Sequence, residues 1–288
     1  MHPIWSFPYY STFIVKQILG YAFFLVVCFI GVGIGVYVGD LEKLRDEDQR
    51  LIKRFMFICC KIGLKFCGYT LEDPRNLRVC YKKWLGPDWK PKWDGACTIV
   101  GNHVSFLESI VLIGSKLASF VGIKQLQKIP GVGLIYAVLR VIAVDRDSIN
   151  SASSREIVKN MINKRQTEMS EGKVRNPLCI YPEGFTTNGE QLASFKKGAF
   201  ASLKPVQPFF IEYCQVEGGT RPDQSNLLLS EFTSFYIMCC GKPGGLIKHT
   251  YLPIFEPNEY FWQQHWEPFK KEKNKVDVYM EIVRGLIL

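Results

Sequence analysis

The chain has 288 residues, of which 47% are hydrophobic, and a formal net charge of +9 from 36 basic and 27 acidic side chains. This length allows one sizeable domain with an anchor or two small domains, and the basic surplus suits nucleic acid, an anionic bilayer surface or phosphorylated substrates. The ten cysteines include no C-x-x-C pair, which argues against a disulfide framework and a structural zinc site and favours reduced, mostly buried thiols.

The first apolar segment, residues 18–38, has no charged residue and is long enough to cross a bilayer as one helix. A cleaved signal peptide is disfavoured because the stretch is too long and begins too deep, whereas Gly31, Gly33 and Gly35 leave a kinked or re-entrant helix open. Basic residues cluster after the segment, so the positive-inside rule places the following domain in the cytoplasm. We interpret residues 1–40 as an amino-terminal membrane anchor.

The next segment, residues 41–95, combines basic and aromatic side chains. Residues 51–71 alternate apolar residues with lysines and arginines, which fits either an amphipathic helix on a membrane surface or a core helix with a solvated basic face. Tryptophans recur among lysines and prolines in residues 82–94, which predicts a loop whose indole rings could lie at the level of the lipid headgroups. We group residues 41–95 as a membrane-surface segment.

From residue 96 onward, short apolar strands alternate with helical sequence. Ser153 and Glu156 form a capping box that begins one helix, and Gly172 ends it. The predicted strands are residues 98–100, 141–144, 178–181, 208–213 and 250–255. This alternation predicts an α/β fold for residues 96–288, with a central mixed sheet flanked by helices.

His103 stands out among the four histidines because it directly follows the end of a predicted strand. Glu108 lies five residues on, a spacing that does not share one face of an ideal helix, but a turn entering a helix can bring the two together. An acid bonded to one imidazole nitrogen fixes the tautomer and raises the basicity of the other. The pair predicts a general base for an attacking hydroxyl, and a purely structural histidine is the alternative.

A second strand ends in Tyr181-Pro182-Glu183-Gly184 and is followed by threonine hydroxyls. Backbone amides and Thr186 in such a turn could hold phosphate oxygens. A plain strand-to-turn connection is the alternative for this segment taken alone.

Together, these segments resemble a known family. Asn102-His103 with an acid five residues past the histidine is similar to the first motif of the PlsC-type glycerolipid acyltransferase superfamily, and the other three motifs follow in family order at residues 141–146, 181–184 and 206–208. Residues 194–200, 206–208 and 251–255 resemble the lysophosphatidylcholine acyltransferase branch most closely. The resemblance identifies residues 96–288 as an acyltransferase catalytic domain, with its core motifs in residues 96–213.

Two positions depart from the family pattern. Glu108 stands where the family usually has aspartate, and Phe185 stands where threonine or serine is common, with Thr186 beside it to take that role. The glutamate motivates a competing hypothesis, a membrane lipid-binding protein that keeps the fold without the activity.

The resemblance implies an acyl-CoA-dependent O-acyltransferase that acylates a lysophospholipid, with acyl-CoA as co-substrate, no bound cofactor and no metal. His103 would be the general base and Glu108 would orient it. Since Glu183 and a phosphate are both anionic, Glu183 is expected to hold Arg146 or a backbone turn. The residues implied in substrate binding are Asn102, Ser105, Arg146, Glu183, Gly184, Thr186 and Lys196.

The partner implied is the phospholipid bilayer, with the endoplasmic reticulum membrane as the location and the catalytic domain on its cytoplasmic side. A nucleic-acid partner is not expected, because the sequence has no recognisable nucleic-acid-binding motif and its basic residues are scattered. A serine hydrolase is also disfavoured, because no G-x-S-x-G elbow is present.

Overall fold

A computed structural model of the chain describes residues 46–93, 95–128, 132–145, 152–215 and 244–288, together with positions 15, 18, 19, 22 and 26. Most of the expected membrane anchor, residues 1–40, lies outside the described residues. Within the described part of the chain, no helix has both the length and the apolar character needed to cross a bilayer.

A mixed sheet organises the described residues, and its strands run in the order β1-β8-β7-β3-β6-β4-β5, with β2 also paired to β8. β7 and β8 are antiparallel and the other pairings are parallel. The predicted α/β fold with a central mixed sheet and flanking helices is therefore confirmed. The strands are β1 (Tyr69–Leu71), β2 (Arg75–Asn76), β3 (Thr98–Gly101), β4 (Ser119–Ile123), β5 (Ile142–Val144), β6 (Leu178–Ile180), β7 (Val206–Gln215) and β8 (Gly245–Tyr251).

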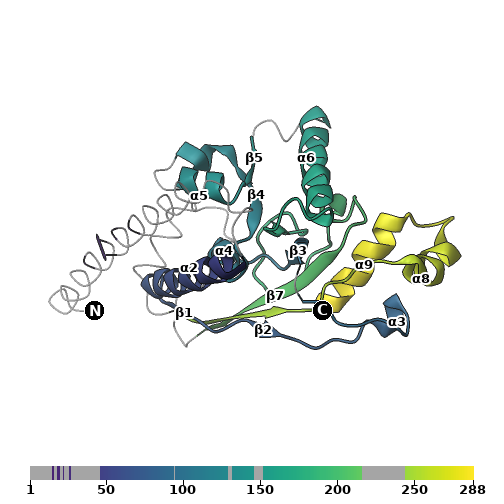
Figure 1. The fold of residues 1–288 in the computed structure, drawn as a ribbon, viewed down its shortest axis with the longest axis horizontal. Helices are drawn as coiled ribbons and strands as arrows, with labels where there is room; N and C mark the ends of the chain where they lie inside the picture. Colours follow the sequence, from purple (N-terminus) through teal and green to yellow (C-terminus); the bar gives the residue numbers. More distant parts are fainter. Residues whose placement is uncertain are drawn as a thin grey trace.

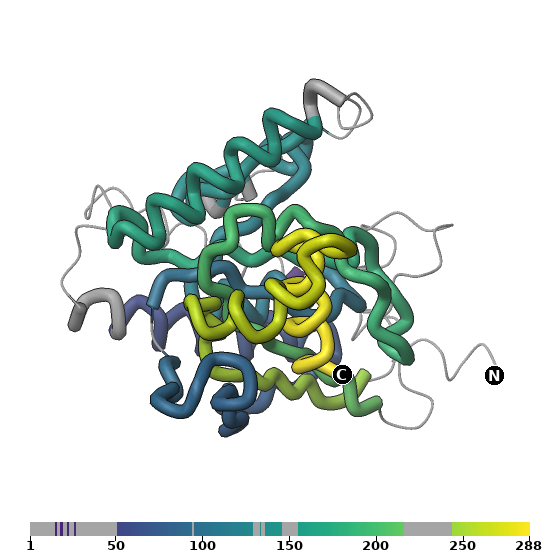
Figure 2. The backbone as a smooth tube through the Cα atoms, turned by 90° about the vertical axis from the view of Figure 1, so that its right-hand side faces the viewer, coloured from purple at the N-terminus to yellow at the C-terminus, as the bar shows by residue number. Residues whose placement is uncertain are grey.

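Helices cover both faces of this sheet (Figure 1). They are α2 (Asp46–Phe66), α3 (Lys82–Leu85), α4 (Leu107–Lys116), α5 (Val132–Val138), α6 (Ala152–Ser170), α8 (Glu259–Phe261) and α9 (Lys275–Ile287), and short helical turns of other types cover Lys124–Lys128, Lys197–Ala199, Trp262–Trp266 and Glu267–Phe269. Figure 2 shows α6 crossing the top of the molecule with α9 below it.

The two sides of the sheet carry separate hydrophobic clusters because successive strand residues point to opposite faces. On β3, Ile99 belongs to the cluster beneath α2 and α4, and Val100 belongs to the cluster beneath α3, α8 and α9. A third cluster packs α6 against β5 and β6 through Ile162, Val144 and Leu178. β3, in the middle of the sheet, is thus buried on both faces, which gives the residues that follow it a rigid support.

The segment before β3 is part of this architecture. β1 and β2 extend the sheet by pairing with β8, and α2 packs against α4, with Cys60 in close contact with Gly114. The outer side of α2 nevertheless exposes apolar side chains, since Leu51 is 69% and Ile58 is 49% exposed. α2 therefore packs in the core as one of the two alternatives for residues 51–71 expects, and contact of its exposed face with a membrane stays a prediction.

The tryptophans of the segment 82–94 lie closer to the core than the sequence suggested. The rings of Trp84 and Trp89 pack around buried Tyr81, at centroid distances of 6.1 Å and 5.0 Å. Both indoles are half-buried against the cluster beneath α9. The short helix α3 fixes this arrangement, and the predicted loop is confined to the residues around it.

His249 is a buried histidine on β8. Its Nε2 donates to the Glu72 carbonyl oxygen at 3.1 Å, and its Nδ1 lies 3.3 Å from the Tyr251 hydroxyl. Burial lowers the pKa of His249 from 6.5 to about 4, because the apolar surroundings disfavour the imidazolium. The bond to Glu72 and the charge of Asp73 raise the pKa of His249 more weakly. The charges of Lys116 and Lys61 lower it slightly.

The first prediction concerns Gly101, the last residue of β3. A Cβ atom there would collide with the carbonyl oxygen and ring of Phe209 on the neighbouring strand, and strand backbone cannot move aside cheaply. We expect Gly101→Ala to lower the free energy of unfolding by about 1–3 kcal/mol, measured by thermal unfolding in detergent. Gly285→Ala, at a helical site with open space, is the control and should not destabilise the protein; equal melting temperatures for the two variants would contradict the packing at Gly101.

The second prediction concerns pH. The pKa of His249 is lower in the folded chain than in the unfolded chain, so the stabilising contribution is complete above pH 6.5 and is lost as the pH falls through about 4. The loss should be roughly 3 kcal/mol across this window. Denaturant titrations between pH 7 and pH 4 should show that the free energy of unfolding falls less steeply with pH for His249→Gln than for the wild type. The same pH dependence in both proteins would contradict the prediction.

Candidate active site

The candidate site lies where neighbouring parallel strands of the sheet end. β3 and β6 are paired with Val100 opposite Ile180, so the residues after these strands emerge side by side at one edge. His103 follows β3 and Glu183 follows β6. Carboxyl ends of parallel strands are the usual place for a site in α/β proteins.

His103 and Glu108 are in direct contact. Nδ1 of His103 lies 2.6 Å from Oε2 of Glu108, whose side chain is completely buried. Glu108 lies in the first turn of α4, and its Oε1 accepts hydrogen bonds from the amides of Val104 at 3.1 Å and Ser105 at 2.7 Å. The carboxylate therefore holds the turn that precedes its own helix against the first turn of that helix, which brings His103 within reach despite the five-residue spacing.

Tyr213 supplies a further donor to the same carboxylate and was missed in the sequence. Its hydroxyl, on β7, donates to Oε1 of Glu108 at 2.7 Å. Burial raises the pKa of Tyr213 well above its usual value, and the Glu108 charge acts in the same direction. A tyrosine near the end of a predicted strand was the only available signal, and nothing local connected it to Glu108.

The contacts of Glu108 define the tautomer of His103. Backbone amides and a protonated phenol can only donate to Oε1, which favours the ionised carboxylate, so Nδ1 of His103 carries the proton in the bond to Oε2. Among the described residues, none forms a hydrogen bond with Nε2 of His103. The imidazole stacks on the Tyr181 ring, with the ring centroids 3.9 Å apart and an angle of 7° between the ring planes. The His103 side chain is 19% exposed. An imidazole held in this way can accept a proton at Nε2.

Asn102 and Ser105 shape the turn that carries His103. The Asn102 amide donates to the Ile211 carbonyl oxygen and accepts from the Ile211 amide, both at 2.9 Å, which ties the turn to β7. Ser105 is fully buried, and its hydroxyl oxygen accepts from the Leu107 amide at 3.4 Å. Their direct contact with a substrate stays a prediction.

Glu183 is also completely buried, and both of its carboxylate oxygens bind backbone amides. Oε1 accepts from the amide of His103 at 2.7 Å, and Oε2 accepts from the amide of Ala193 at 2.8 Å. Of the two structural roles weighed for Glu183, the geometry matches the holding of a backbone turn. Contact between Glu183 and a substrate stays a prediction.

The outer side of the same turn is exposed. Gly184 has a φ of 76°, and a Cβ atom there would collide with the side chain of Lys196, so the lysine stem lies across the glycine. Nζ of Lys196 is 6.0 Å from the ring centroid of Phe185, which is 57% exposed. Thr186 beside them is half-buried. A cation, an aromatic ring and a side-chain-free backbone thus share one surface close to His103.

Thr187 is a second residue that the sequence did not single out as part of the site. Its amide donates to the His103 carbonyl oxygen at 2.7 Å, and its hydroxyl donates to the same oxygen at 3.3 Å. The amide of His103 binds Glu183, so both backbone groups of His103 are held by the 181–187 turn. Arg146, the remaining predicted phosphate ligand, lies outside the described residues.

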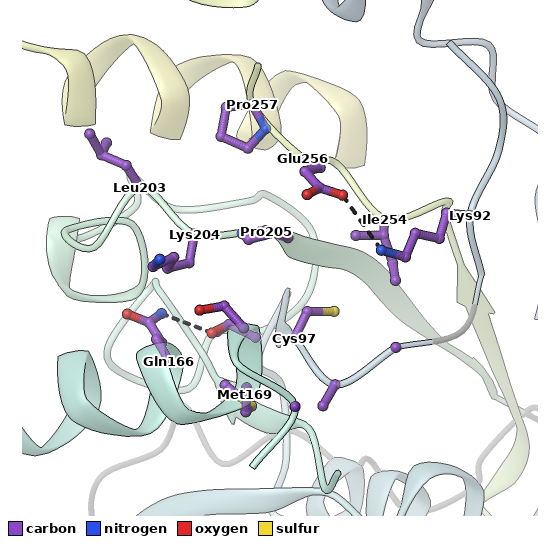
Figure 3. Close-up of a pocket in the computed structure, with 15 residues that line it drawn as sticks. Lys92, Cys97, Gln166, Met169, Leu203, Lys204, Pro205, Ile254, Glu256 and Pro257 are labelled. Carbon is purple, nitrogen blue, oxygen red and sulfur yellow. Dashed lines mark hydrogen bonds and ion pairs between the residues drawn. The ribbon is translucent and has the colours of Figure 1, made fainter. Parts of the chain in front are cut away.

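A cavity of about 410 Å³ lies elsewhere, at the amino end of β3 (Figure 3). Its lining includes Cys97 and Thr98 together with Lys92, Lys204 and Gln166. His103 follows the opposite end of the same strand, so this cavity is separate from the candidate site. Within the described ranges, no group of three or more histidine, cysteine or acidic side chains gathers where it could hold a metal ion.

Comparison with known proteins gives matches across this region. A family model described as Acyltransferase matches residues 72–212. Lysophospholipid acyltransferase LPEAT1 of Arabidopsis thaliana is 36% identical over 124 residues, which cover 43% of this chain and 30% of that protein. Lysophosphatidylcholine acyltransferase 2 of Rattus norvegicus is 30% identical over 227 residues, which cover 78% of this chain and 37% of that protein.

The chain thus spans about a third of the length of the curated relatives it matches. Among solved structures, the 1-acyl-sn-glycerophosphate acyltransferase PlsC from Thermotoga maritima is 14% identical, with a TM-score of 0.48 and coverage of 94% of both chains.

The third prediction tests Glu183 as a structural anchor. In Glu183→Gln, one oxygen that accepts from an amide becomes an amino group that faces an N–H donor, so one buried backbone amide loses its partner. We expect a loss of about 2 kcal/mol in the free energy of unfolding, measured by denaturant titration. Glu190→Gln, at an exposed position in the same connection, should leave stability unchanged, and equal stability of the two variants would rule out the anchoring role.

Proposed function

This chain carries a domain of the acyltransferase family over residues 72–212, and from that membership we propose that it is an acyl-CoA-dependent O-acyltransferase acting on a lysophospholipid. The family membership confirms the resemblance that the four motifs indicated. The acceptor we propose is lysophosphatidylcholine or a related lysoglycerophospholipid. The relatives are named lysophospholipid and lysophosphatidylcholine acyltransferases, which supports this class of acceptor.

The observation that carries the proposal is the contact between His103 Nδ1 and the buried Glu108 carboxylate at 2.6 Å. This contact leaves the lone pair of His103 Nε2 available at the half-buried edge of the imidazole, next to the turn of residues 184–186. An oriented imidazole of this kind is the group that acyl transfer to an alcohol requires.

In the proposed reaction, Nε2 of His103 takes the proton of the acceptor hydroxyl while the hydroxyl oxygen attacks the thioester carbonyl carbon. The tetrahedral intermediate collapses with cleavage of the carbon–sulfur bond, and the imidazolium returns its proton to the departing thiolate. The products are the ester and free coenzyme A. General base catalysis of this kind contributes about 10²–10⁴-fold, and the Glu108 carboxylate stabilises the imidazolium that forms in between.

Substrate binding is assigned to the exposed turn. We propose that Gly184 and Thr186 lie against the acceptor's phosphate region, with Arg146 as its charge partner, and that Lys196 attracts the anionic donor. Support comes from the exposure of Gly184 and Lys196 and from the bare backbone at a φ of 76°. Positively charged groups are ordinary ligands of phosphate oxygens.

We also propose that the enzyme works at a bilayer, on the cytoplasmic side of the endoplasmic reticulum membrane. The apolar segment of residues 18–38 and the basic residues that follow it support this orientation. The exposed apolar side chains Leu51, Ile58 and Ile62 on α2, interspersed with lysines and arginines, suit contact with an anionic lipid surface.

The fourth prediction tests the chemistry. Membranes that contain the chain, incubated with labelled acyl-CoA and a panel of lysolipids, should form the diacyl product from at least one lysophospholipid. His103→Gln should lower kcat at least about a hundredfold, because the base is lost. His265→Gln removes a histidine that bonds only to the Lys83 carbonyl oxygen among the described residues, and it should behave as wild type.

Full activity of His103→Gln would overturn this mechanism. A wild-type chain that binds lysolipid but transfers no acyl group would favour the second candidate function, a membrane lipid-binding member of the same fold. The motivation for that candidate is Glu108 at the position where the family usually has aspartate.

A further inference from the structure

The Glu108 carboxylate is surrounded by four donors, and one of them is far away in the sequence. Two are amides of the local turn, Val104 and Ser105, and one is His103 itself. The fourth, Tyr213, lies 105 residues further along the chain. Tyr213 is therefore the only part of this arrangement, among the described residues, that is neither in the turn nor in α4.

The position of Tyr213 is fixed by the residues next to it. Asn102, the neighbour of His103, binds both backbone groups of Ile211, and Tyr213 lies two residues on and points to the same face of β7. The Tyr213 ring packs edge-on against Tyr69, with centroids 6.0 Å apart at 81°. β8 pairs with Tyr213 through Ile247. The hydroxyl is thus held at one place relative to the His103 turn.

The hydroxyl is also a permanent donor. A carboxylate can only accept, so the 2.7 Å contact is a bond from Tyr213 to Glu108. Burial raises the pKa of Tyr213 well above its usual value, so the phenol keeps its proton at neutral pH. The bond disperses negative charge on Oε1 and fixes the plane of the carboxylate, and therefore the direction of Oε2 toward His103.

The length of the glutamate matters for this bond. An aspartate at position 108 would withdraw the carboxylate toward the α4 backbone by roughly one carbon–carbon bond, about 1.5 Å. A contact of 2.7 Å would then lengthen to about 4 Å, beyond hydrogen-bonding distance. The longer acid and the tyrosine hydroxyl fit each other in this chain.

We propose that Tyr213 is a positioning residue for acyl transfer, matched to Glu108, which holds the carboxylate in the orientation that makes His103 an effective base. This rests on the proposed function of His103 as the base. On this proposal, the glutamate that replaces the usual aspartate is needed for the bond from Tyr213. Glu108 and Tyr213 act together, and Glu108→Asp does not improve the enzyme.

The fifth prediction is kinetic. Tyr213→Phe keeps the ring packed on Tyr69 and removes only the hydroxyl. We expect kcat to fall about tenfold, because a hydrogen bond to a charged group is lost, with the KM for acyl-CoA changed less than about twofold.

Tyr81→Phe is the matched control. Tyr81 is fully buried and its hydroxyl donates to the Pro253 carbonyl oxygen at 3.1 Å, in a cluster that does not include Glu108. It loses a buried hydroxyl just as Tyr213→Phe does, so a purely structural effect would appear in both variants. Tyr81→Phe should retain the wild-type kcat and the wild-type KM for acyl-CoA.

A double-mutant cycle tests the matching. Glu108→Asp should lower kcat, and adding Tyr213→Phe to Glu108→Asp should cost less than about twofold, since the bond is already broken. A tenfold loss in both backgrounds, or no loss from Tyr213→Phe alone, would overturn the proposal.

A spectroscopic measurement separates this proposal from the proposed function. The Nδ1 proton of His103, in a 2.6 Å bond to a carboxylate, should give a low-field proton resonance that is absent in His103→Gln. Tyr213→Phe should shift this resonance and Tyr81→Phe should not. The positioning role then stands or falls on that shift even if no lysolipid is acylated by the wild type, a result that would refute the proposed function alone.

Discussion

Burial of the Glu108 carboxylate is the constraint that organises this site. A negative charge removed from water is costly unless donors surround it, and Glu108 has a completely buried side chain. Its donors come from the turn after β3 and from β7, so the charge is accommodated only when the helix, the turn and the sheet are all in place. The orientation of His103 is in this sense a product of the tertiary fold, because one of the donors to Glu108, the Tyr213 hydroxyl, comes from β7.

The same site divides its residues into two groups by exposure. The buried acids, Glu108 and Glu183, bind backbone amides and hold the turns that follow β3 and β6. The exposed residues, Gly184, Phe185 and Lys196, lie on the outer surface of the second turn. Each acid is thus an internal support, and the groups free to meet a ligand are the ones that the sheet leaves uncovered.

Much of this was predictable from the sequence. The ends of β3 and β6, the mixed sheet and the candidate pairing of His103 with Glu108 followed from apolar patterning and a five-residue spacing, which are local signals. β4 was missed, and the strand expected at residues 250–255 lies at Gly245–Tyr251 instead. The bond from Tyr213 to Glu108 and the choice of the His103 amide as a partner of Glu183 were not predictable, because they join residues 105 and 80 positions apart. β1 and β2 were missed for a related reason: strands of three and two residues carry too little pattern to be recognised before their partner is known.

The pairing of β1 with β8 has a consequence for how the protein is made. Tyr69 on β1 lies opposite Gly245 on β8, so the first strand of the sheet has its partner 176 residues further along the chain. Such non-local pairing slows folding, because a long loop must close before the contact is formed. During synthesis on the ribosome, β1 must wait for β8 to emerge, so the sheet closes at this edge only after residues 72–244 have been translated.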